Sequence, residues 1–91
     1  MNNTIIMIFQ RNDTAESFDI EVPAEITANE LIFGLNKGLN LGINMDDPSD
    51  AYLRTENPVS LLRGDDEIES FHLHAGTKII YDRSQKAIEI G

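Results

Sequence analysis

The segment 18–41 changes its hydrophobic period at Pro23, and this change constrains the fold more than any other feature of the chain. Before the proline, acidic residues alternate with apolar ones, a pattern typical of a strand with one buried face. The apolar residues of this alternation are Phe18, Ile20 and Val22. From Thr27 the apolar residues recur instead with a helical period. The segment therefore predicts a strand that leads directly into one amphipathic helix.

The start of this helix has the sequence of a capping box. Thr27 precedes Glu30 by three residues, so the threonine hydroxyl can accept the Glu30 amide while the Glu30 carboxylate accepts the Thr27 amide. Glycine is common just after a helix, which predicts that Gly42 ends it. The apolar stripe of the helix consists of Leu31, Ile32, Leu35 and Leu39.

The other elements follow from turn residues and apolar runs. Residues 4–10 are apolar at every position from 5 to 9, which predicts a central strand covered on both faces. A polar turn at 11–16 then predicts an antiparallel hairpin with 18–22. After a loop at 44–50, we expect strands at 51–55 and 59–63, a helical turn at 67–73 and a closing strand at 77–82.

This order predicts an α+β fold, with about four or five strands in one mixed sheet and one helix packed across one face. The first and last strands belong in the middle of the sheet. A chain of 91 residues has room for one domain, which we place at 1–82. Residues 83–91 are expected to form a flexible tail, with an edge strand at 87–90 as the alternative.

The composition of the chain argues against several classes of function. The chain has no cysteine, which excludes disulfides, thiolate zinc sites and cysteine nucleophiles. Its net charge of −9 disfavours nucleic acid and predicts either a basic protein partner or simple solubility. No apolar run approaches the ~18 residues of a membrane span and no signal peptide is evident, so we expect a cytoplasmic protein without membrane insertion.

No cluster of residues predicts an active site, a metal site or a cofactor. His72 and His74 have the spacing of a metal pair, but no cysteine or placed carboxylate completes a ligand set. Three aspartates in the loop 44–50 lack the pattern of a calcium loop. No glycine-rich phosphate loop and no nucleophile beside a base are present. We therefore expect a protein that is not an enzyme.

Two candidate protein-binding surfaces remain. If a helix covers one face of the sheet, only every second side chain of residues 5–9 can point toward it. Hydrophobic spacing favours Ile6 and Ile8 inward, so an exposed patch is predicted opposite, unless the tail or a second subunit of a homodimer covers it. The residues of this patch are Met7, Phe9 and Ile80. The second candidate is the acidic cluster Asp65, Asp66 and Glu67.

The order of elements resembles the β-grasp, or ubiquitin-like, fold. Residues 18–24, and the run 66–76 with Ile68, Phe71 and Leu73 before a glycine turn, are similar to the YukD/EsaB family. These ubiquitin-like proteins are encoded with type VII (ESAT-6-like, WXG-motif) secretion systems of Gram-positive bacteria. The resemblance covers residues 4–82.

The YukD/EsaB resemblance implies a non-enzymatic accessory protein that contacts components of the secretion machine. It also implies no conjugation, and the chain ends in a single glycine rather than the Gly-Gly that an activating enzyme requires. The alternative is a scaffold domain unrelated to secretion, in which the acidic cluster pairs with a basic face in PB1-like association.

Overall fold

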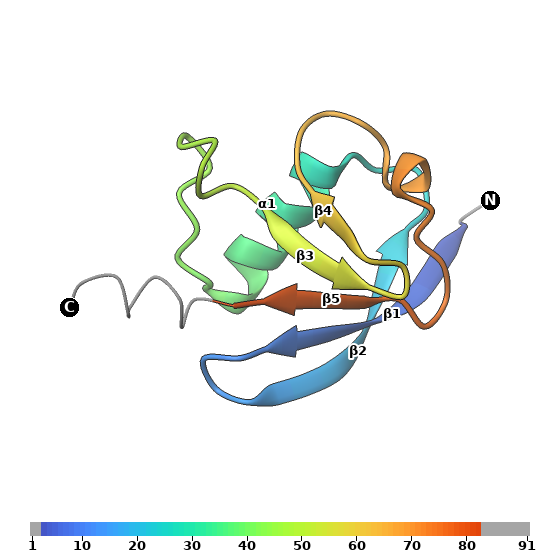
Figure 1. The fold of residues 1–91 in the computed structure, drawn as a ribbon, viewed down its shortest axis with the longest axis horizontal. Helices are drawn as coiled ribbons and strands as arrows, with labels where there is room; N and C mark the ends of the chain where they lie inside the picture. Colours follow the sequence, from blue (N-terminus) through green and yellow to red (C-terminus); the bar gives the residue numbers. More distant parts are fainter. Residues whose placement is uncertain (1–2, 83–91) are drawn as a thin grey trace.

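One helix crosses one face of a mixed sheet in the computed structural model, which describes residues 3–82 (Figure 1). The helix, α1 (Ala28–Leu39), follows the first hairpin after a short turn. Among residues 3–82, no helix covers the opposite face of the sheet. The predicted tail at 83–91, and its alternative edge strand at 87–90, lie outside the described residues.

The sheet has five strands in the order β2-β1-β5-β3-β4. β1 (Thr4–Arg11) pairs antiparallel with β2 (Glu16–Pro23) and parallel with β5 (Lys78–Tyr81). β5 pairs antiparallel with β3 (Leu53–Glu56), which pairs antiparallel with β4 (Ser60–Leu62). The first and last strands are therefore central, as predicted, and the expected α+β arrangement is confirmed.

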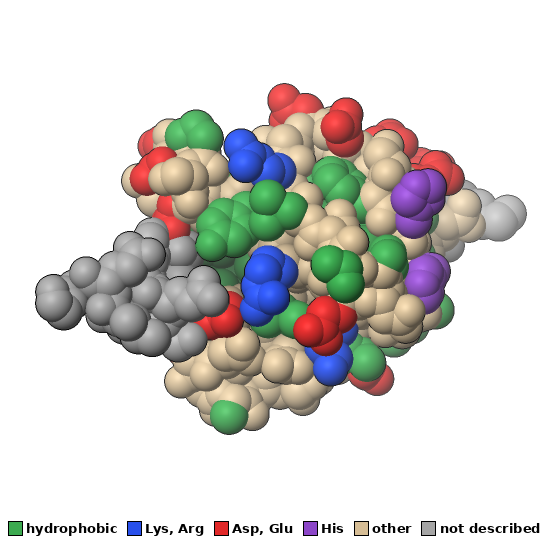
Figure 2. Space-filling view, viewed as in Figure 1, with side chains coloured by type: hydrophobic (Ala, Val, Ile, Leu, Met, Phe, Trp, Pro, Cys, Tyr) green, Lys and Arg blue, Asp and Glu red, His purple; other side chains and the backbone are tan. Residues whose placement is uncertain are grey.

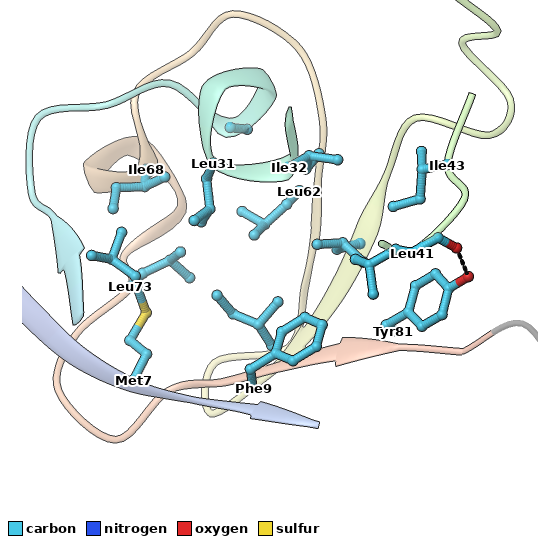
Figure 3. Packing of buried hydrophobic residues seen from close by; sticks show 14 residues of the cluster. Met7, Phe9, Leu31, Ile32, Leu41, Ile43, Leu62, Ile68, Leu73 and Tyr81 are labelled. Atoms are coloured by element: carbon cyan, nitrogen blue, oxygen red, sulfur yellow. Dashed lines mark hydrogen bonds between the residues drawn. The ribbon is translucent and has the colours of Figure 1, made fainter. Parts of the chain in front are cut away.

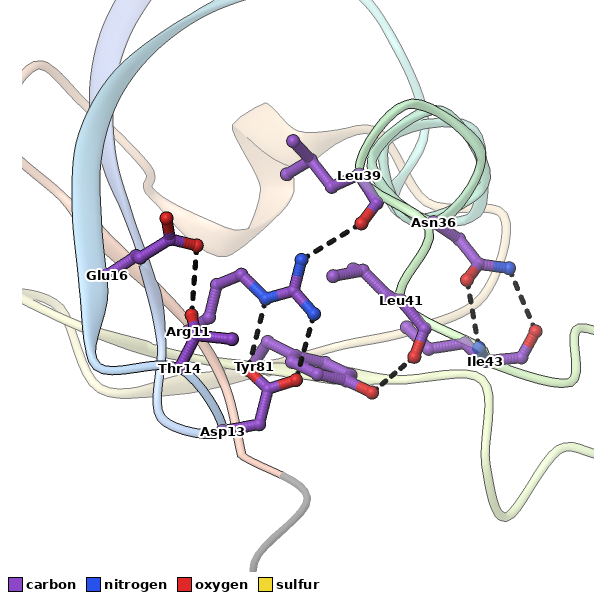
Figure 4. Close-up of polar contacts among 9 residues, drawn as sticks. All are labelled: Arg11, Asp13, Thr14, Glu16, Asn36, Leu39, Leu41, Ile43 and Tyr81. Atoms are coloured by element: carbon purple, nitrogen blue, oxygen red, sulfur yellow. Dashed lines mark hydrogen bonds and ion pairs between the residues drawn. The ribbon is translucent and has the colours of Figure 1, made fainter.

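The predicted capping box starts α1. The Thr27 hydroxyl accepts the Glu30 amide at 3.0 Å, and the Glu30 carboxylate accepts the Thr27 amide at 2.8 Å. The end of the helix was predicted wrongly at Gly42, because Asn40 already adopts the left-handed conformation (φ 56°) that asparagine tolerates. The Asn36 side chain fixes the chain beyond it, donating to the Ile43 carbonyl and accepting the Ile43 amide, both at 2.8 Å (Figure 4).

The core lies between α1 and the sheet (Figure 3). The short 3₁₀ helix η1 (Ile68–Phe71) closes one end of this core with its buried Ile68. Several side chains in the core have no exposed surface, so their apolar area is fully removed from water. These side chains are Met7, Phe9, Ile32, Leu62, Ile68 and Ile79.

The prediction of which β1 side chains point toward the helix was wrong. Met7 and Phe9 are both 0% exposed and point toward α1, whereas Ile6 is 49% exposed. The physical reason is the register of the hairpin, which places Phe9 opposite Phe18 and Met7 opposite Ile20. Partners opposite each other share a face, so the inward side of β1 must match the apolar side of β2.

Arg11 joins the end of α1 to the sheet (Figure 4). Its guanidinium donates to the Leu39 carbonyl at 2.9 Å, pairs with Asp13 at 2.8 Å and lies 5.6 Å from the centre of the Tyr81 ring. The Tyr81 hydroxyl donates to the Leu41 carbonyl. A cation at the C-terminus of a helix is favourable because the helix dipole is negative there.

The pair of Arg11 and Asp13 predicts a pH-dependent contribution to stability. The hydrogen bond from Arg11 lowers the pKa of Asp13 below its ordinary value of 3.8. The contribution is therefore fully present above that value and is lost as the pH falls through the lower pKa of the folded state. Because the pair is partly exposed, we expect less than about 1 kcal/mol.

Urea unfolding of wild type and Asp13→Asn, followed by circular dichroism over a pH series, measures this contribution. We expect wild type to be more stable at neutral pH and the difference to disappear under strongly acidic conditions. A difference that stays constant across the series would contradict the assignment.

Candidate functional site

The candidate site is the face of the sheet opposite α1, called the open face below. Strand register defines its residues, since partners directly opposite each other point to the same side. The first row across the face runs from Leu61 through Arg54 and Ile80 to Gln10. The second row contains Glu56, Lys78, Ile8 and Asp19, and Ile6 stands opposite Glu21 beside it.

Apolar side chains on the open face are only partly buried. Ile6 is 49% exposed and Leu61 is 42% exposed, and Ile8, on the same strand as Ile6, is half-buried. Val59, in the turn between β3 and β4, is 87% exposed. Apolar side chains on several strands of one face provide area that a partner can bury.

Ile80 lies on the open face, as expected, but it does not offer the exposed surface that was predicted. Only 3% of it is exposed. β5 is the central strand, and the cross-strand neighbours of Ile80 are the long side chains of Gln10 and Arg54. Ile80 therefore forms the floor of the site, while Ile6 and Leu61 are its accessible apolar groups.

Positive charge is also present on the open face. Arg54 and Lys78 project from it, and Arg54 pairs with Asp82 at 3.2 Å while its side chain stays 46% exposed. Figure 2 looks onto this face and shows Lys and Arg side chains over β3, β4 and β5 among apolar ones, with Asp and Glu side chains both beside them and at the periphery. The open face therefore combines apolar side chains with charges of both signs, because Asp19, Glu21 and Glu56 lie on it beside Arg54 and Lys78.

The acidic cluster lies elsewhere. Asp65, Asp66 and Glu67 are exposed, but the structure ties their segment to the start of α1. The Ala28 amide donates to the Asp66 carbonyl at 2.9 Å, and the Asn29 side chain donates to the Asp65 carboxylate at 3.1 Å. Carboxylates near a helix N-terminus are stabilising, which gives the cluster a structural role.

The predicted site residues therefore fall in three places. Met7 and Phe9 belong to the core, Ile80 to the floor of the open face, and the acidic cluster to the start of α1. Sequence reasoning missed Ile6, Leu61 and Arg54. The position of Ile6 could have been found from the alternation of apolar and acidic residues in β2. Once β1 and β2 are paired, this alternation determines which side chains of β1 point toward the helix.

The described part of the chain gives little support to other kinds of site. Within residues 3–82, no group of three or more His, Cys, Asp or Glu side chains could hold a metal ion. The His74 ring lies 2.8 Å from the Ala75 carbonyl through Nδ1, which is a local contact. No helix in the same range is long and apolar enough to cross a membrane.

Comparison with known proteins gives matches at the level of structure. No protein-family model matches the chain, and no curated protein sequence matches it significantly. A ubiquitin-like domain of tubulin-binding cofactor B superimposes with a TM-score of 0.69 at 15% identity, covering 94% of this chain and 96% of that one.

Two further ubiquitin-like domains are similar. The C-terminal domain of mouse tubulin-specific chaperone e gives a TM-score of 0.68 at 10% identity, covering 89% of this chain and 87% of that one. A domain from an Arabidopsis thaliana protein gives 0.62 at 13% identity, covering 86% and 74%. The chain therefore has the ubiquitin-like β-grasp fold.

Proposed function

We propose that this domain is a non-enzymatic protein-binding module that binds its partner through the open face. The observation that carries the proposal is that Ile6 and Leu61 are exposed on the same face as Arg54 and Lys78. Burial of apolar surface supplies affinity, and complementary charge supplies orientation and specificity. The partner that fits is a protein surface with apolar side chains, a carboxylate that can meet Arg54, and basic groups that can meet Asp19, Glu21 and Glu56.

The net charge of −9 does not oppose an acidic partner at contact distance. At physiological ionic strength, charges separated by more than about 8 Å are largely screened. Arg54 and Lys78 would meet the partner directly, whereas the acidic cluster sits at the start of α1. The sequence-based expectation of a basic partner stays a prediction, because the open face carries Asp19, Glu21 and Glu56 as well as Arg54 and Lys78.

Partner capture with surface variants tests the proposal. The immobilised domain is incubated with lysate of the source organism, and captured proteins are quantified by mass spectrometry for wild type, Leu61→Asp and Arg54→Glu. The matched control is Phe33→Asp, because Phe33 is 54% exposed on the helix. We expect a set of proteins that both open-face variants lose by about tenfold or more and that the control retains.

The opposite pattern would overturn the proposal. A captured set that Phe33→Asp loses and Leu61→Asp retains would place binding on the helix side. Concentration-dependent, salt-sensitive self-association that Arg54→Glu abolishes would instead support the PB1-like alternative, in which the cluster 65–67 of one copy meets the open face of another.

The narrower proposal is that the partner is a component of a type VII secretion machine. Its support is the YukD/EsaB resemblance of residues 18–24 and 66–76, and the open face would provide the contact surface. The test is the gene neighbourhood. WXG-motif substrates and an FtsK/SpoIIIE-type ATPase encoded beside this gene would support the secretion role. A neighbourhood without them would contradict the secretion role and would leave the proposal of a protein-binding open face intact.

A further inference from the structure

A cleft lies between the loop 44–51 and the segment 63–64 that follows β4, beside the start of α1. It has a volume of about 180 Å³ and is called the loop cleft below. None of its lining residues belongs to the rows of the open face, so the two surfaces are distinct. The lining residues are Asn29, Met45, Pro48, Ala51, Arg63 and Gly64.

Both walls of the loop cleft are held by hydrogen bonds of the domain itself. The Gly64 amide donates to the Asn29 side chain at 3.1 Å, and the Asn29 amide donates to the Gly64 carbonyl at 2.9 Å. Within the loop 44–51, the Asp50 carboxylate accepts the Asn44 amide at 2.7 Å. The cleft is therefore formed before a ligand arrives, which lowers the entropic cost of binding.

The size and floor of the loop cleft favour one inserted side chain. Apolar lining comes from Ala51, which is 8% exposed, from half-buried Met45 and from exposed Pro48. The volume is well below the about 300–1,000 Å³ of typical small-molecule sites. A single large apolar side chain of a partner protein therefore suits the cleft better than a cofactor does.

Arg63 favours an aromatic side chain over an aliphatic one. It lines the cleft, is exposed and makes no ion pair with any other residue of the range 3–82. A guanidinium is planar and weakly hydrated, so it stacks well on an aromatic ring. An aromatic ring in the cleft can contact the apolar floor and Arg63 together.

The charges around the loop cleft select the residues beside that ring. The loop wall carries Asp46 and Asp47, and Asp65 directly follows the other wall. The Asp65 carboxylate accepts the side chain of Asn29, a lining residue, at 3.1 Å. Arg63 is the only Lys or Arg that lines the cleft. Carboxylates thus stand on both sides of the cleft, and Lys or Arg beside the inserted ring would complement them.

We propose that the loop cleft binds an aromatic side chain of a partner protein, which stacks on Arg63 while neighbouring Lys or Arg residues of the partner pair with Asp46 and Asp65. This site goes beyond the proposed function because it is separate from the open face and recognises a basic segment with an aromatic anchor. The domain would then contact proteins through two surfaces.

Amide chemical-shift titration of the labelled full-length chain with short peptides tests the proposal. The probe is the tripeptide Lys-Trp-Lys with both ends blocked. Glu-Trp-Glu reverses the flanking charge, and Lys-Ala-Lys removes the ring. We expect Lys-Trp-Lys to give saturable shifts at Asn29, Met45, Ala51 and Gly64, and the other two peptides to bind about tenfold more weakly or not at all.

Variants of the cleft are compared with matched variants elsewhere. Arg63→Gln is paired with Arg54→Gln on the open face, and Asp46→Lys is paired with Asp19→Lys, which changes the net charge equally. All four side chains are exposed, so circular dichroism should report every variant as folded. We expect each cleft variant to weaken Lys-Trp-Lys binding by about threefold or more and each control to have a smaller effect.

Several results would overturn the inference. These are the absence of saturable shifts with Lys-Trp-Lys, equal affinity for either of the other peptides, and unchanged binding to Arg63→Gln. Shifts at Ile6 and Leu61 in place of the cleft residues would show that the peptide binds the open face. That result would overturn this inference and leave the proposed function standing.

Discussion

Phe9→Asp is expected to abolish the folded state of the domain. Phe9 is 0% exposed and packs toward α1 in the centre of the core, with its ring 5.7 Å from that of Phe18. Removal of a buried phenylalanine side chain typically costs about 3–5 kcal/mol, and an unpaired buried carboxylate adds a desolvation penalty. These costs are comparable to the total stability of a small domain, about 5–15 kcal/mol.

Far-ultraviolet circular dichroism and urea unfolding measure this effect, with Ile6→Asp as the matched control. Ile6 lies on the same strand but is 49% exposed on the open face. We expect the control to keep the folded spectrum and to lose much less stability than Phe9→Asp. The assignment of Phe9 to the core and of Ile6 to the open face would be refuted if Phe9→Asp stayed folded while Ile6→Asp unfolded.

Ile32→Ala is expected to lower the free energy of unfolding by about 2–5 kcal/mol, the usual range for a large-to-small change in a core. Ile32 is 0% exposed and belongs to the cluster that joins α1 to the sheet. The cavity left behind cannot collapse easily because the surrounding side chains are packed.

Urea unfolding of Ile32→Ala is compared with that of Phe33→Ala on the same helix. Phe33 is 54% exposed, and its ring lies 5.5 Å from the Lys37 ammonium. Loss of this exposed contact should cost no more than about 1 kcal/mol. Equal effects at the two positions would contradict the assigned orientation of α1.

Most of the fold was predictable because its signals are local or follow from simple packing rules. The capping box of Thr27 and Glu30 depends on residues three apart, and the structure confirms it. The central positions of β1 and β5 follow from apolar residues on both faces of these strands. The end of α1 was missed because asparagine and glycine both tolerate the left-handed conformation, and Asn40 comes first.

The orientation of β1 could not be obtained from β1 alone. A run that is apolar at every position from 5 to 9 contains no period-2 signal, so its own sequence allows either parity. The information lies in β2, where apolar and acidic residues alternate. Once the hairpin register pairs Phe9 with Phe18, the parity of β1 follows.

The charge of the candidate site could not be predicted from composition. Net charge is a property of the whole chain, whereas binding depends on which side chains share a surface. Arg54, Lys78 and Leu61 are separated in sequence and meet only through the pairing of β3 with β4 and β5. The acidic cluster was conspicuous in the sequence because its residues are consecutive, yet its neighbours in the structure are residues at the start of α1.

The central claim is that the open face binds the partner. Amide chemical-shift mapping with the isolated partner tests it most directly: the labelled domain is titrated, and shifted residues are placed on the structure. We predict that the shifts concentrate on β1, β3, β4 and β5, with Ile6, Arg54 and Leu61 among the largest, and that α1 is nearly silent. Shifts confined to α1 and the segment 64–68, with the open face unchanged, would contradict the claim.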